Sequence, residues 1–77
     1  MNCILLNELP INRTATIENL NCHGNIRRRL LDLGIIKGSK ITPVLKSPSG
    51  DPTAFEIRGS IIALRKEITE LIEVNIK

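Results

Sequence analysis

The fold of this chain depends on residues 24–40, which read G-N-I-R-R-R-L-L-D-L-G-I-I-K-G-S-K. They predict a helix that begins at Asn25, whose side chain can accept a backbone N–H, and that ends at Gly34, which can supply a positive φ. Apolar residues recur along this helix at Ile26, Leu30 and Leu33. We expect these three to face the hydrophobic core, because side chains at this spacing share one face of a helix.

The other face of the predicted helix is charged. It carries Arg27, Arg28, Leu31 and Asp32. Together with Arg29, the arginines fall in the first helical turn, where the positive end of the helix dipole disfavours each cation by about 0.3–1 kcal/mol. Positions where a sequence departs from the locally more stable residue choice are modestly enriched in functional residues. We therefore interpret this face as a candidate partner-binding surface. A solvated helix face is the alternative interpretation.

Leu31 helps to choose the kind of partner. An apolar side chain flanked by Arg27 and Arg28 fits a protein contact with a polar rim better than it fits phosphate binding. Charge alone does not distinguish an acidic protein from a nucleic-acid backbone or an anionic membrane surface. The alternative role for Leu31 is to cover the end of a small barrel.

Length and composition predict one small domain, residues 1–77. Eleven lysines and arginines barely exceed eight aspartates and glutamates, so the net charge of +3 is a local patch and the chain is not a polycation. Phe55 is the one aromatic residue. Proteins that bind single-stranded nucleic acids stack the bases on aromatic side chains, so this composition argues against a nucleic-acid partner. Two cysteines are too few for the disulfide framework of a small secreted protein. The apolar run of residues 3–6 is too short for a signal peptide or membrane span. We therefore expect a cytoplasmic protein without direct membrane insertion.

Short alternating segments predict a mainly β fold of about five strands. The expected strands are residues 14–20, 39–46, 53–58, 61–64 and 72–76, and residues 59–60 are expected to form the turn between the third and the fourth. Alternation places Ala15 with Ile17 on one side of the first strand, Ile41 with Pro43 and Leu45 on one side of the second, and Phe55 with Ile57 on the inward side of the third. Pro43 cannot donate to a ladder and indicates an edge or a bulge, and Pro10 makes the opening residues an extended lead-in with a turn. One helix lies between strands 1 and 2, and a short helical turn at residues 66–71 precedes the last strand. We predict a small closed barrel, because closure removes exposed strand edges.

Neither catalytic residues nor a strong metal site can be assembled from the sequence. A nucleophile needs a base and an orienting group, and His23 is the only histidine. Cys22, His23 and Cys3 could offer thiolate and imidazole to a soft metal ion, but adjacent residues chelate one ion poorly and no C-x-x-C spacing is present. We predict no enzyme, no metal ligands and no bound cofactor.

Four blocks of the sequence form a specific combination. They are R-R-L-L-D-L-G-I-I-K-G-S-K-I (residues 28–41), S-P-S-G-D-P-T-A-F-E-I-R-G (47–59), S-I-I-A-L-R-K-E (60–67) and I-E-V (72–74). In these blocks the chain resembles the FeoA family, small proteins of the ferrous iron uptake system. The resemblance covers almost the whole chain.

The resemblance implies an SH3-like β-barrel and a cytoplasmic accessory protein that acts on the membrane ferrous iron transporter FeoB. Similar barrels form the C-terminal domain of iron-dependent repressors, so binding of ferrous iron or another transition metal is implied at the level of the family only. Our leading hypothesis is that the protein binds FeoB through Arg27, Arg28, Leu31 and Asp32. The alternatives are a transition-metal-binding regulatory module and, less favoured by composition, a nucleic-acid-binding barrel.

Overall fold

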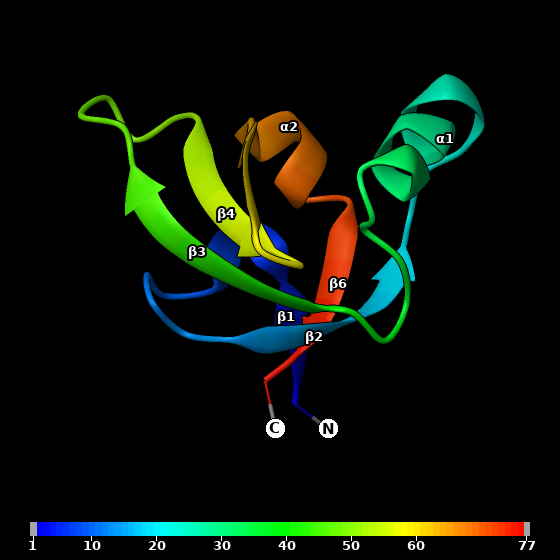
Figure 1. The fold of residues 1–77 in the computed structure, drawn as a ribbon, viewed down its shortest axis with the longest axis horizontal. Coiled ribbons are helices and arrows are strands. Elements are labelled where there is room, and N and C mark those ends of the chain that lie inside the picture. The colour runs from blue at the N-terminus through cyan, green and yellow to red at the C-terminus, as the bar shows by residue number, and fades with distance from the viewer. Residues whose placement is uncertain (1, 77) are drawn as a thin grey trace.

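The computed structural model describes residues 2–76 and is built mainly from β-strands (Figure 1). In chain order the elements are β1 (Cys3–Leu5), the 3₁₀ helix η1 (Leu6–Glu8), β2 (Ala15–Leu20), α1 (Gly24–Asp32), β3 (Lys40–Lys46), β4 (Thr53–Ile57), β5 (Ser60–Leu64), α2 (Lys66–Thr69) and β6 (Ile72–Asn75). The predicted helix, the predicted helical turn before the last strand and the five predicted strands are all present. The mainly β class is therefore confirmed.

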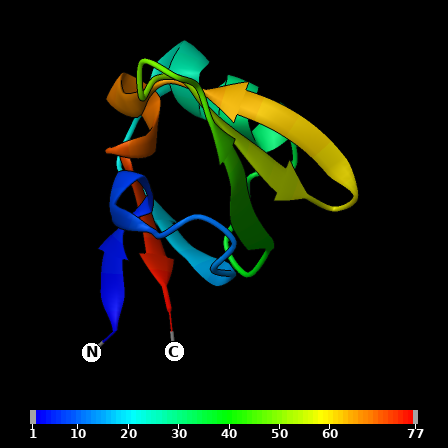
Figure 2. The same ribbon diagram turned by 90° about the vertical axis from the view of Figure 1, so that its left-hand side faces the viewer.

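The strands form one antiparallel sheet in the order β1-β6-β2-β3-β4-β5. Figure 2 shows the sheet curling around the core, with the β4–β5 hairpin projecting away from the two termini. The end strands β1 and β5 do not pair with each other, so the barrel is not strictly closed as we predicted. Instead, η1 follows β1, α2 follows β5, and these two helical turns pack against each other. The contact between η1 and α2 therefore lies where pairing of β1 with β5 would have closed the barrel.

The strand β1 was not predicted. Its residues pair with β6 in the register Cys3↔Asn75, Ile4↔Val74 and Leu5↔Glu73. We expected an extended lead-in with a turn there, and three residues are too few to show the alternating pattern of a strand. The pairing adds a sixth strand to the sheet.

The core is a single cluster of apolar side chains from nearly every element. Its buried members are Leu6, Leu9, Ala15, Ile17, Leu20, Cys22, Leu30, Ile35, Ile41, Phe55, Ile57, Leu64, Ile72 and Val74. The inward positions predicted for Phe55 and Ile57 are confirmed, and Ala15 and Ile17, which we expected together on one side of their strand, are buried as well. Leu45 is different, because it was expected to share a face with Ile41 and is 67% exposed.

A β-bulge explains the exposure of Leu45. The register of β3 against β4 shifts between Pro43 and Leu45, which inserts one extra residue and reverses the direction of the following side chains. Pro43 itself is fully buried, so the predicted bulge at this proline is confirmed. A second bulge in β2 lies between Ile17 and Asn19 and allows both Ile17 and Leu20 to face inward.

The helix α1 ends as predicted but begins differently and buries less. Gly34 has φ +90°, the left-handed conformation that terminates the helix. The N-cap position belongs to His23 and Asn25 lies inside the helix, so the predicted cap at Asn25 is wrong. Of the three residues expected in the core, Leu30 alone is buried, whereas Ile26 is 45% and Leu33 is 41% exposed. The helix stands to one side of the sheet, beyond the end of β2 (Figure 1).

A tight turn and a fastened loop shape the part of the molecule that contains β4, β5 and α2. Arg58 and Gly59 both have positive φ and form the two-residue turn of the β4–β5 hairpin, so the turn precedes Ser60, which we had placed inside it. The carboxylate of Asp51 accepts the backbone N–H of Lys66 at 2.8 Å and pairs with the Arg65 guanidinium at 3.3 Å. The loop between β3 and β4 is thereby fastened to the start of α2.

Candidate protein-binding surface

The predicted partner-binding residues lie together on the outer face of α1. Arg27, Arg28, Leu31 and Asp32 are all exposed. Leu31 keeps 39% of its surface accessible. A helix places residues three and four positions apart on the same face, so the grouping that we inferred from spacing is present in the structure. We refer to these four residues as the outer face.

The arginines of the outer face are not equivalent. Arg27 donates from Nη1 to the backbone carbonyl of Leu20 at 3.3 Å, which ties the first turn of α1 to the end of β2. Within residues 2–76 the one ion pair is Arg65–Asp51, so Arg28 and Asp32 do not form the contact that their spacing allows. The first turn contains no acidic residue and no side-chain cap, and its positive end is left uncompensated. Arg28 therefore presents its charge to a partner more freely than Arg27.

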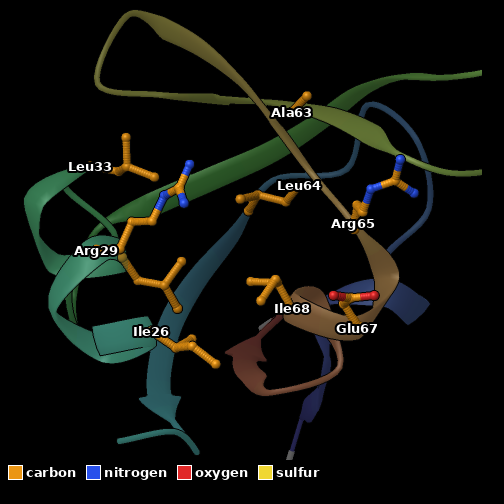
Figure 3. A pocket seen from close by; sticks show the side chains of 9 residues that line it. Ile26, Arg29, Leu33, Ala63, Leu64, Arg65, Glu67 and Ile68 are labelled. Atoms are coloured by element: carbon orange, nitrogen blue, oxygen red, sulfur yellow. The ribbon is translucent and has the colours of Figure 1, made fainter. Parts of the chain in front are cut away.

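The opposite side of α1 borders a cleft of about 330 Å³ that the sequence did not predict. Figure 3 shows α1 on one side of this cleft and the segment from β5 into α2 on the other. Its lining residues are Ile26, Arg29, Leu30, Leu33, Ala63, Leu64, Arg65, Glu67 and Ile68. The cleft is thus mainly apolar, with a few charged groups at its rim.

The charges at the rim of the cleft are mostly positive. The Arg29 side chain extends from α1 toward the β5 side, and its guanidinium forms no hydrogen bond or ion pair within the part of the chain that the structure describes (Figure 3). Arg65 lies on the opposite side and keeps 64% of its side chain exposed despite its ion pair with Asp51. Glu67 is the one acidic residue of the lining. A negatively charged group would therefore be attracted to the α1 side.

Sequence reasoning missed the cleft because it assigned Ile26 and Leu33 to the core. Helical spacing shows that these residues share a face with Leu30, but it does not show what packs against that face. The remaining wall comes from residues 63–68, thirty or more positions further along the chain. Arg29 borders the apolar stripe in the helical projection, and a cation beside such a stripe was the one available signal.

The predicted weakness of the metal-ligand set can be compared with the geometry. Between residues 2 and 76, no three side chains of the His, Cys, Asp or Glu type gather closely enough to hold a metal ion. Cys22 is buried, Cys3 is half-buried and His23 is exposed at the start of α1. The same residues contain no helix that is both long and apolar enough to cross a membrane.

Comparisons with known proteins agree on one family. The family model described as the FeoA domain matches residues 4–76. A candidate Fe(2+) transport protein A from Campylobacter jejuni is 35% identical over 71 residues, which are 92% of this chain and 96% of the relative. In Porphyromonas gingivalis, a fusion of Fe(2+) transport protein A with the Fe(2+) transporter FeoB is 34% identical over 71 residues, which are 92% of this chain and 8% of the fusion protein.

A solved structure supports the same assignment. The FeoA of Stenotrophomonas maltophilia, crystallised with zinc and described as a procaryotic SH3 domain protein, superposes with a TM-score of 0.82 at 33% identity. The match covers 94% of this chain and 89% of that one. The SH3-like architecture that the resemblance implied is therefore confirmed.

Proposed function

The chain belongs to the FeoA family, and from this premise we propose that it is an accessory protein of ferrous iron uptake that acts in the cytoplasm by binding the membrane transporter FeoB. On this proposal the protein works by binding and not by catalysis.

The fusion protein of Porphyromonas gingivalis is the observation that carries this proposal. In it, a region similar to this chain shares one polypeptide with FeoB. A covalent link raises the effective concentration of the two parts, which favours a contact that separate chains make more weakly. The fusion thus supports FeoB as the partner of this chain.

We propose the outer face of α1 as the contact surface. Leu31 supplies exposed apolar area, and Arg28 and Asp32 surround it with charges that have no internal ion pair among the described residues. Protein interfaces commonly combine an apolar centre with a polar rim, and arginine is enriched in them. Arg27 contributes partly through its hydrogen bond to Leu20, which holds the helix in place.

Metal binding is a second candidate, since the FeoA of Stenotrophomonas maltophilia was crystallised with zinc. The residues of this chain do not fit such a site, because no cluster of three metal-ligating side chains is present between residues 2 and 76. A zinc site of protein ligands needs three or four nitrogen, sulfur or oxygen donors converging on one point. We therefore place no step of the proposed function on a bound metal.

The test is a pull-down of the cytoplasmic part of FeoB, at low and at physiological salt and with and without guanine nucleotide. We expect Leu31→Asp to weaken saturable binding by about tenfold or more, because it places a carboxylate at the apolar centre of the contact. Ile11→Asp is the matched control, since Ile11 is 41% exposed, nearly the same as Leu31, and lies outside α1. Circular dichroism verifies that both variants fold. Wild-type affinity for Leu31→Asp would exclude the outer face, and a wild-type protein that binds in none of these conditions would overturn this partner surface.

A further inference from the structure

The strand β5 is an end of the sheet and has one paired edge. Its partner is β4, and the two-residue turn between them places Ile57 opposite Ser60. The pair that flanks such a turn is hydrogen-bonded, and bonded pairs alternate with non-bonded pairs along an antiparallel ladder. It follows that Ile62 and Leu64 also bond to β4, whereas the N–H and C=O groups of Ile61 and Ala63 point to the other edge. No strand of residues 2–76 pairs with that edge.

The cleft described above runs along this unpaired edge. Its lining includes the consecutive residues Ala63, Leu64 and Arg65. Successive side chains of a strand point to opposite faces, so a cleft that touches three in a row follows the edge of the strand and not one face. Figure 3 shows these residues across the cleft from α1. The outward backbone groups of Ala63 are therefore accessible from the cleft.

The wall opposite the edge is apolar and only partly covered. Ile26 of α1 and Leu33 at the C-cap of that helix remain 45% and 41% exposed, and Leu30 beside them is buried. On the β5 side, Ile68 of α2 is half-buried. An extended chain that pairs with a sheet edge directs every second side chain to the same face. Apolar residues at alternate positions would then cover Ile26 and Leu33, which the fold itself leaves open.

The positive charge around the cleft favours an acidic partner segment over a basic one. Arg29 borders the cleft without an ion pair in the described part of the chain, and Arg65 stands on the other side. The helix α1 as a whole carries three arginines and one aspartate. Carboxylates placed between the apolar residues of a partner would meet this positive rim, whereas lysines would be repelled.

We infer that the cleft between α1 and β5 binds an extended segment of another protein, acidic and apolar in alternation, by adding it as a further strand to the free edge of β5. The backbone of Ile61 and Ala63 supplies the pairing, Ile26, Leu33 and Ile68 receive the apolar side chains, and Arg29 receives a carboxylate. The cleft volume of about 330 Å³ accommodates a few residues of such a chain. This surface is separate from the outer face, and the inference does not rest on a role in iron transport.

The experiment uses a labelled peptide of about seven residues that alternates valine with glutamate, and a second peptide in which lysine replaces glutamate. We expect saturable binding of the glutamate peptide below about 1 mM by fluorescence anisotropy, and at least about tenfold weaker binding of the lysine peptide. Amide hydrogen exchange measured by NMR gives the mode of binding. The amides of Ile61 and Ala63 should exchange about tenfold or more slowly when the glutamate peptide is saturating.

Two variants test the site. Ala63→Pro removes an outward N–H and leaves the bonds to β4, which come from Ser60, Ile62 and Leu64, and we expect it to weaken the glutamate peptide about tenfold or more. Leu33→Asp places a negative charge in the cleft and should have a similar effect. Ile11→Asp is again the control, because Ile11 and Leu33 are both 41% exposed and Ile11 lies outside the cleft. It should bind the peptide as the wild type does.

Three results would overturn the inference. They are a glutamate peptide that does not bind below about 1 mM, binding that leaves the exchange of the Ile61 and Ala63 amides unchanged, and full binding by folded Ala63→Pro and Leu33→Asp proteins. Because the probe is a free peptide, a negative result with FeoB leaves this test unaffected, and failure of the peptide leaves the pull-down unaffected. The two proposals can therefore fail separately.

Discussion

Replacing Leu30 by alanine tests how α1 is attached to the sheet. Leu30 is 3% exposed and is the one residue of α1 that belongs to the buried core. Alanine removes three carbon atoms, which corresponds to about 2.4 kcal/mol of lost burial at about 0.8 kcal/mol per methylene. The cavity left behind adds a smaller cost, so we expect a loss of about 3 kcal/mol in the free energy of unfolding.

The matched variant is Leu33→Ala, three residues away on the same helix face. Leu33 is 41% exposed and borders an open cleft, so its truncation leaves no closed cavity and should cost about 1 kcal/mol. For a chain of 77 residues these values correspond to decreases of about 18 °C and about 6 °C in Tm. Urea unfolding followed by far-ultraviolet circular dichroism is the suitable assay, because the chain contains no tryptophan or tyrosine. Equal losses for the two variants, with unchanged m-values, would refute the assignment of Leu30 as the anchor.

Two further predictions concern the loop before β4 and the cysteines. Asp51→Ala should lower the free energy of unfolding by about 1 kcal/mol, because it removes the acceptor of the Lys66 N–H at the start of α2. Asp51→Asn keeps an acceptor oxygen and should retain most of that stability. Equal losses for the two variants in urea unfolding would assign the effect to the ion pair with Arg65 instead. Cys3 is half-buried and Cys22 is 6% exposed, so a thiol reagent should label Cys3 first in the native protein, as peptide mass mapping after brief exposure would show. Faster labelling of Cys22 would contradict its place in the core.

The elements that the sequence predicted well are those with a local repeat. Ala15 and Ile17 in β2, and Phe55 and Ile57 in β4, alternate with polar residues, and all four are buried. The exposure of Leu45 could not be predicted from alternation, because the bulge in β3 shifts its register against β4, a strand that lies further along the chain. The strand β1 was missed for a related reason, since three residues form a strand here only by pairing with β6 at the other end of the sequence.

Residue identity and local spacing were enough to predict the family, the mainly β class and the grouping of Arg27, Arg28, Leu31 and Asp32 on one face of a helix. These properties follow from residue identity and from the 3.6-residue period of the helix, which need no information about distant parts of the chain. By contrast, the burial of Leu30 and the opening of Ile26 and Leu33 onto a cleft became known from the folded chain. The period of a helix shows which side chains point the same way, but burial depends on what packs opposite them, and here the opposite wall is the free edge of β5 and the start of α2.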